Sequence, residues 1–164
     1  MAACDSKGLS FSFKAGWDDA CLYIAADVTD NVVINEFPSQ VAYNGDAIEI
    51  WSSALNNKAP RIGPGDYQYV FGVAGQETDT AFKSGGKSQA KCAVHKTNTG
   101  YTMEIAVPLS ELLLGKIKSG YRISFDIAVD DTDSSGVKEH QMLYSAHSAD
   151  VFTNPSLWGD MIFE

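Results

Sequence analysis

The feature that most constrains the fold is a succession of short segments, apolar or alternating, bounded by Gly, Pro, Asn, Asp, Ser and Thr. Residues 10–13, for example, alternate polar and aromatic side chains, which is the period of a half-buried strand. No segment has the length and period of a long helix, although residues 110–114 could form one helical turn. Strands are expected at residues 10–13, 22–28, 46–51, 67–73, 87–95, 101–107, 122–129, 140–144 and 158–163. This spacing predicts an all-β fold, an antiparallel β-sandwich of two sheets in a jelly-roll or immunoglobulin-like arrangement.

No linker, charge run or internal repeat divides the 164 residues, so we expect a single domain over residues 1–164. The formal net charge of −9 repels phosphate groups, which argues against nucleic acid and anionic membranes as partners. An acidic surface is compatible with neutral ligands and with divalent cations. No stretch approaches the roughly 18 apolar residues of a membrane span.

The sequence contains none of the common catalytic motifs: no G-x-S-x-G, P-loop, H-E-x-x-H or G-x-G-x-x-G. Its three histidines, His95, His140 and His147, fit no metal-binding spacing. Asp130 and Asp131 are neighbours, so on a strand they face opposite sides and cannot act as a glycosidase pair on one sugar. We therefore predict a domain that binds a ligand and is not an enzyme.

Five aspartates lie at or near the expected strand ends: Asp27, Asp30, Asp46, Asp130 and Asp131. Hard cations prefer several oxygen ligands, including carboxylates and loop carbonyls. We take Asp30, Asp46 and Asp131 as the candidate ligands of a structural calcium ion. The alternative is turn chemistry alone, since aspartate favours turns without any metal.

Five blocks follow one another in a characteristic order: residues 17–30, 46–51 (DAIEIW), 100–108 (GYTMEIAVP), 124–131 (SFDIAVDD) and 154–160 (NPSLWGD). In this order the chain resembles a family 9 carbohydrate-binding module, of the DOMON-like β-sandwich superfamily. The resemblance implies a sandwich with structural calcium that binds sugars without transforming them. In the family two aromatic side chains clamp a sugar ring while polar groups bind its hydroxyls.

Carried over by position, the resemblance assigns the clamp to Tyr43 and Phe152 and a polar role to Glu49. Sugars present apolar C–H faces that pack on aromatic rings, and charged or amide groups bind hydroxyls. The candidate sugar-binding residues are Tyr43, Glu49, Trp51, Gln68, Phe152 and Asn154. Trp51 shares the face of Glu49 by alternation and could line the groove. Core packing is the expected role of the tryptophans, Trp17, Trp51 and Trp158.

Three departures from the family pattern predict a weaker, different or lost sugar site. Val70 stands where the family has an arginine, and Ala128 where it has a glutamine. The clamp residues are Tyr and Phe instead of Trp.

The predicted function is to target an attached enzyme or a cell surface to plant-type polysaccharide. The expected partners are a polysaccharide or oligosaccharide and a catalytic domain of the parent protein. The expected location is secreted or at the cell surface, although no signal peptide is visible. Two alternatives stay open: a structural spacer without a sugar site, and a haem-binding redox domain. Haem ligands would come from Met103, Met142, Met161, His140 and His147, although core filling is the ordinary role of such methionines.

Overall fold

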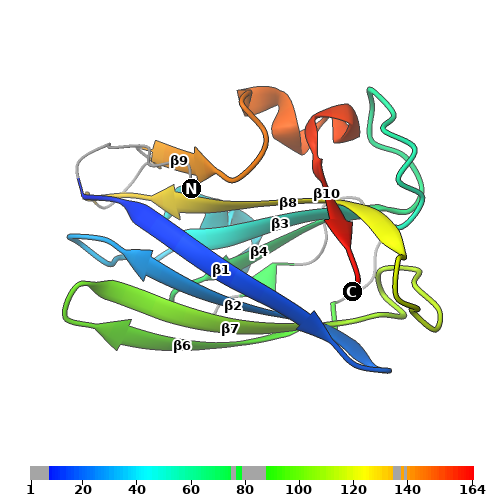
Figure 1. Ribbon diagram of the computed structural model, residues 1–164. Coiled ribbons are helices and arrows are strands. Elements are labelled where there is room, and N and C mark those ends of the chain that lie inside the picture. The colour runs from blue at the N-terminus through cyan, green and yellow to red at the C-terminus, as the bar shows by residue number, and fades with distance from the viewer. Residues whose placement is uncertain (1–7, 75–76, 79–87, 135–137, 139) are drawn as a thin grey trace.

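The computed structural model describes residues 8–74, 77–78, 88–134, 138 and 140–164, and it confirms the antiparallel β-sandwich (Figure 1). One sheet has the strand order β1-β2-β7-β6. The other has the order β10-β8-β3-β4-β5, and β9 also pairs with β8. The strands are β1 Ser10–Trp17, β2 Cys21–Thr29, β3 Ala47–Ser53, β4 Asp66–Gly72, β5 Glu77–Thr78, β6 Lys91–Thr97, β7 Gly100–Pro108, β8 Arg122–Asp131, β9 His140–Leu143 and β10 Gly159–Ile162.

The core lies between the two sheets and follows the alternation of the sequence. In β2 the side chains of Leu22, Ile24, Ala26 and Val28 are buried, and the residues that alternate with them are exposed or only partly buried. Ile48 and Ile50 of β3 face them from the other sheet. Each such side chain contributes about 1.5–3 kcal/mol on burial, which explains why the period-two pattern identified these strands.

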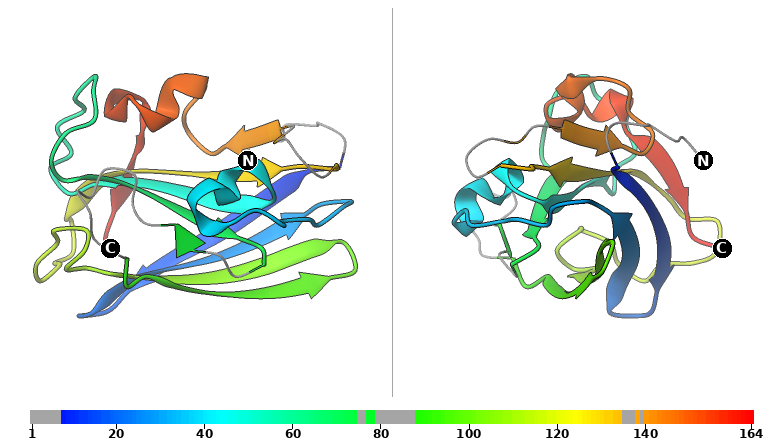
Figure 2. Two further views of the ribbon diagram at one scale, coloured as in Figure 1. Left: turned by 180° about the vertical axis from the view of Figure 1, so that it is seen from behind. Right: turned by 90° about the vertical axis from the view of Figure 1, so that its left-hand side faces the viewer.

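β3 and β8 are buried on both faces, because a further layer covers the outer face of their sheet (Figure 2). This layer consists of three short 3-10 helices: η1 Ser39–Asn44, η2 Ala149–Phe152 and η3 Pro155–Leu157. η1 lies between the strands expected at residues 22–28 and 46–51, where the sequence indicated no further element. None of the helical segments in the described part of the chain is long and apolar enough to span a bilayer.

Several boundaries differ from the expectation. β1 continues beyond residue 13, where the expected strand ends, to Trp17. Trp17 is 36% exposed, and its ring packs edge-on against Phe163 instead of filling the core. The expected strand 87–95 begins at Lys91, and residue 87 lies outside the described residues. Residues 110–113 form turns, and no helix is present over residues 110–114.

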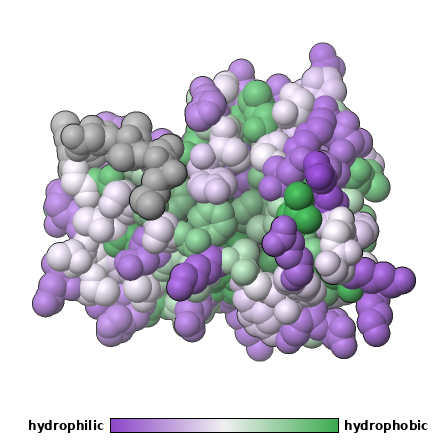
Figure 3. All heavy atoms as spheres, in the orientation of Figure 1, coloured by the Kyte–Doolittle hydropathy of each residue, from purple (hydrophilic) through white to green (hydrophobic). Residues whose placement is uncertain are grey.

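Among the described residues, β1 forms no backbone pairing with β8 or β10, which belong to the other sheet. In the orientation of Figure 1, apolar side chains form a band near the middle of the surface, where β1 lies beside β8 and β10 (Figure 3). There the ring of Phe13 packs edge-on against Tyr144 with 4.9 Å between centroids.

Gly100 begins β7, directly after the short turn that joins β6 to β7. Its φ is +140°, and a Cβ atom here would lie 2.1 Å from the carbonyl oxygen of Val28. Only glycine permits this approach. The approach also brings the carbonyl of Thr99 within 2.9 Å of the backbone nitrogen of Asp30 and so fixes the end of β2.

Candidate functional site

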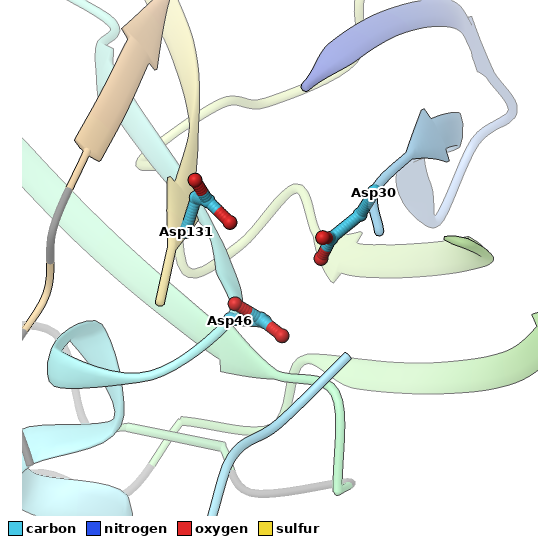
Figure 4. A group of neighbouring side chains, drawn as sticks. All are labelled: Asp30, Asp46 and Asp131. Carbon is cyan, nitrogen blue, oxygen red and sulfur yellow. The ribbon is translucent and has the colours of Figure 1, made fainter. Parts of the chain in front are cut away.

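Three carboxylates from different segments meet at one end of the sandwich (Figure 4). Asp30 follows β2, Asp46 precedes β3 and Asp131 ends β8. All three are buried, and one oxygen of each lies within 4.8 Å of the others. The structure thus brings together the three aspartates taken from the sequence as metal ligands, and the cluster could hold a metal ion.

The charge state of Asp46 reflects this setting. Burial raises the pKa of Asp46 to about 7, and the charges of Asp30 and Asp131 add to the effect. Hydrogen bonds from the backbone N–H groups of Thr132 (2.9 Å) and Ile34 oppose the increase without cancelling it. A bound cation would remove this penalty, because its positive charge favours the ionised carboxylates.

The buried hydroxyl of Tyr101 is a second indication, besides the three carboxylates, that a polar ligand binds near the cluster. Its hydroxyl is buried and has no hydrogen-bond partner among the described residues. Burial raises the pKa of Tyr101 well above its ordinary value, and the nearby charges of Asp46 and Asp30 raise it further. Three carboxylates and an unpaired hydroxyl form an all-oxygen donor set, which suits a hard cation.

A second polar group is centred on Glu49, in the middle of β3. Its side chain points to the outer face, opposite Ile48 and Ile50, as alternation predicted, and is 3% exposed. Both carboxylate oxygens accept hydrogen bonds: Oε2 from Gln68 Nε2, and Oε1 from Gln141 Nε2 at 2.9 Å.

Lys138 and Gln141 connect Glu49 to a second carboxylate, that of Asp130. Lys138 Nζ lies 3.4 Å from Glu49 Oε1 and 3.0 Å from Asp130 Oδ1, and Gln141 Nε2 lies 2.9 Å from the same Asp130 oxygen. Asp130 is fully buried. Burial raises the pKa of Asp130 well above its ordinary value, the charge of Glu49 adds to this, and Lys138 opposes it.

The sequence did not predict Lys138 or Gln141. The pairing of Asp130 with Gln141 across β8 and β9 is what places Gln141 on the face of Glu49. Alternation within one strand cannot reveal such a cross-strand partner. Asp130 and Asp131 do face different groups, as predicted: Asp131 the acidic cluster and Asp130 the Glu49 network.

The two aromatic residues predicted to form the sugar clamp are located on short helices above the same sheet. Tyr43 in η1 is 39% exposed and Phe152 in η2 is 50% exposed. Lys138 Nζ lies 5.7 Å from the centroid of the Tyr43 ring, which is within the range of a cation–π contact. Tyr43 therefore borders the Glu49 network.

The packing of these two helices on the sheet explains where Tyr43 and Phe152 lie. In η1, Ala42 packs on Ala47 and Val70, and in η2, Val151 packs in a cluster with Ala128. Val70 and Ala128 are the residues directly opposite Glu49 on its two neighbouring strands. The helices that carry Tyr43 and Phe152 are thus anchored on opposite sides of Glu49.

Two other candidates have structural contacts. Trp51 is fully buried in a cluster with Val151 and Trp158, so it supports the outer layer from below and presents no surface to a ligand, unlike the expected groove position. Trp158 is in this second core, as predicted. Asn154 caps η3, where its Oδ1 accepts a hydrogen bond from the backbone of Ser156 at 3.1 Å.

With this geometry established, the comparison with known proteins is informative. Residues 1–164 match the family described as carbohydrate family 9 binding domain-like. The chain belongs to this family. A family 9 module is a binding module without catalytic activity, in agreement with the prediction from the sequence.

The similar proteins are much longer enzymes. The chain is 29% identical over 159 residues to Exoglucanase XynX of Acetivibrio thermocellus, which covers 96% of this chain and 14% of that protein. It is 27% identical to Endo-1,4-beta-xylanase A of Thermoanaerobacterium saccharolyticum, covering 96% of this chain and 13% of that protein. The module thus spans about one seventh of the length of these curated relatives.

Solved structures share the fold. A family 9 carbohydrate binding module of Caldicellulosiruptor kristjanssonii in complex with cellotriose has a TM-score of 0.83 and 22% identity, covering 98% of this chain and 78% of that chain. Its complex with glucose gives the same score and identity, with 98% and 80% covered. At this identity the likeness supports the fold.

The methionines of the haem alternative have core positions. Met103 and Met142 are buried in the main core of the family 9 module, and Met161 packs against it. This is the core-filling role that the sequence favoured for them.

Asp126 ties the outer layer to the sheet. Its fully buried carboxylate accepts hydrogen bonds from Ser145 N (3.1 Å), Ser145 Oγ (3.0 Å) and Ala146 N (2.8 Å). We expect Asp126→Asn to lower the free energy of unfolding by about 2 kcal/mol, because an amide group cannot accept all of these bonds. The melting temperature should fall by about 4–8 °C in differential scanning calorimetry. Asp27→Asn, at an exposed position of β2, is the matched control, and an equal effect of both variants would contradict the anchoring role.

Proposed function

We propose that this module binds plant-type polysaccharide by clamping a sugar ring between Tyr43 and Phe152. The observation that carries the proposal is the buried carboxylate of Glu49 between the anchors of two exposed aromatic residues. Its oxygens hold amide and ammonium groups in fixed positions. Aromatic faces for C–H groups beside oriented donors for hydroxyls are the combination that sugar recognition requires.

Within this site Glu49 is a positioning residue. It is nearly inaccessible and its oxygens are occupied, whereas Gln68, Gln141 and Lys138 are half-buried and can meet sugar hydroxyls. Val70 and Ala128 flank Glu49 where the family pattern has longer polar residues. Lys138 and Gln141 reach the same carboxylate from the segment after β8, so they would supply the missing polar groups from another part of the chain.

We further propose that the acidic cluster holds a structural calcium ion through Asp30, Asp46 and Asp131. One oxygen of each carboxylate lies within 4.8 Å of the others, which is close enough for a single ion to contact all three. Calcium accepts carboxylate, hydroxyl and carbonyl oxygens in a flexible geometry, whereas magnesium usually keeps several water ligands. The ion would brace the ends of the segment between β2 and β3 that carries Tyr43.

The relatives support a proposal for the partners and the location. Exoglucanase XynX and Endo-1,4-beta-xylanase A are named as polysaccharide-degrading enzymes, and the module covers a small part of each. We propose that here too it serves a catalytic domain of a secreted or cell-surface protein.

Affinity electrophoresis in gels that contain soluble β-glucan or xylan tests this function. The module should be retarded by at least one of them. Gln141→Leu should weaken binding at least about tenfold, which corresponds to one lost hydrogen bond to a polar ligand. Gln89→Leu, at an exposed position away from Glu49, should bind as the unaltered module does. Unretarded migration in every polysaccharide would favour the spacer alternative.

A further inference from the structure

The outer face of the β1-β2-β7-β6 sheet, which faces away from Glu49, contains a groove of about 690 Å³. Gly16, Ala25, Ala93 and Ala106 line its floor. Glycine and alanine are poor strand residues, and a glycine within a strand often marks the close approach of a ligand. A Cβ atom on Gly16 would meet nothing within 4 Å, and its φ is not positive, so neither packing nor backbone geometry requires glycine there.

Four longer side chains alternate with this floor. Across the strands Lys14 pairs with Ala25, which pairs with Glu104, and Tyr23 pairs with Ala106, which pairs with Lys91. Within the part of the chain that the structure describes, Lys14, Lys91 and Glu104 form no hydrogen bond or ion pair through their side chains. The groove thus offers free donors and a free acceptor around a floor without long side chains.

Tyr23 is held in place before any ligand arrives. Its ring is 41% exposed, and its hydroxyl donates to Asp18 Oδ2 at 2.9 Å. Asp18 is itself fixed by the N–H groups of Ala20 (2.7 Å) and Cys21 (2.8 Å). The hydrogen bond to Asp18 raises the pKa of Tyr23 to about 12, so the hydroxyl stays protonated. A ring fixed in advance loses little conformational entropy on binding.

We propose that this groove is a second carbohydrate site, which binds a segment of a neutral polysaccharide chain. Sugar hydroxyls both donate and accept, so one ligand can pair with Lys14, Lys91 and Glu104 while its C–H face packs on Tyr23. An apolar protein surface would bury three unpaired charges at a high cost. A polyanion would meet Glu104 and Asp18 in a chain of net charge −9. The groove is independent of the proposed site around Glu49, and the module would hold one chain segment on each outer face.

Titration of ¹⁵N-labelled module with cellohexaose and xylohexaose, followed by NMR, separates the two sites. We expect the amide signals of Ala25, Ala93 and Ala106 to shift, and to shift equally in a Phe152→Ala variant. Tyr23→Ala and Ala25→Gln should each weaken the groove response at least tenfold. Ala25 lies on an exposed strand face, so the glutamine can be accommodated without loss of folding.

Ser12→Gln enlarges an exposed β1 residue outside the groove and should leave the response unchanged. Shifts confined to residues around Glu49 would overturn the groove proposal and leave the first site intact. Shifts in the groove that survive both Tyr23→Ala and Ala25→Gln would also overturn it. If no amide signal shifts with either sugar, in the groove or around Glu49, both the groove proposal and the proposed function would be overturned.

Discussion

Alanine at Tyr43 or at Phe152 is expected to reduce the affinity for a recognised polysaccharide by about 30-fold or more. Truncation of a central aromatic contact commonly costs at least about 2 kcal/mol of binding free energy, which is a factor of about 30. Both rings are well exposed and lie on the outer layer, so the melting temperature should change by no more than about 2 °C. Isothermal titration calorimetry and a thermal melt on the same samples measure the two quantities.

The control for these variants is Tyr121→Ala. Tyr121 is 42% exposed and precedes β8, far along that strand from Asp130, and its ring contacts Phe163. Its loss removes a similar exposed aromatic surface without touching the Glu49 network. Unchanged affinity of both Tyr43→Ala and Phe152→Ala, or unfolding of both variants, would show that the clamp is assigned to the wrong residues.

Removal of divalent cations should lower the melting temperature at pH 7.5 by about 5–10 °C. A ligand present at 100 times its dissociation constant stabilises the folded state by about 2.7 kcal/mol, and each kcal/mol corresponds to about 2–4 °C in a domain of this size. Asp46→Asn should abolish the difference between calcium-saturated and metal-free protein, because it removes a ligand at the centre of the cluster.

The pH dependence of this effect has a definite sign. In the metal-free protein the pKa of Asp46 is raised from 3.8 to about 7, so the folded state holds the proton more tightly than the unfolded chain. The resulting stabilisation is complete below about pH 4 and is lost as the pH rises to about 7. Calcium requires the ionised carboxylate, so its affinity should rise up to about tenfold per pH unit in that interval.

The gap between calcium-saturated and metal-free melting temperatures should therefore widen from pH 5 to pH 7.5. Protein dialysed free of metal at each pH, then melted with and without added calcium, gives this gap directly. Asp27→Asn should reproduce the behaviour of the unaltered module, since Asp27 is exposed on β2. Equal melting temperatures with and without calcium at every pH would contradict a structural ion.

Much of the sandwich could be predicted because its core strands obey a local rule. β2 and β7 alternate between core and solvent, and that period is visible in the sequence. The strands β3 and β8 were expected from the sequence. That both faces of these strands are covered was not expected. The covering layer of η1, η2 and η3 depends on contacts between distant segments, and such short helices have no period of their own.

The candidate site likewise contains residues that could be predicted from the sequence and residues that could not. Asp30, Asp46 and Asp131 could be selected because each lies at a strand end. Asp46 and Asp131 lie at the ends of paired strands, and the end of β2 in the facing sheet brings Asp30 to them. The alternation that placed Glu49 correctly also suggested Trp51 for the same surface. Trp51 is buried because η2 and η3 pack over it, a tertiary effect that period alone does not contain. Lys138 and Gln141 depend on the pairing of β8 with β9.

The anchoring of the outer layer by Asp126 has an evolutionary consequence. β9 and β10 both pair with β8, and the chain between them leaves the sheet and returns to the same strand. At the start of this segment the backbone N–H of Ala146 donates a hydrogen bond to Asp126. At its end the indole Nε1 of Trp158 donates a hydrogen bond to the carbonyl oxygen of Val151 at 2.8 Å. The exposed residues between these fixed points, Phe152 among them, can therefore change without loss of the scaffold. Under the proposed sugar clamp, changes in this one segment would alter the ligand preference and leave the sandwich intact.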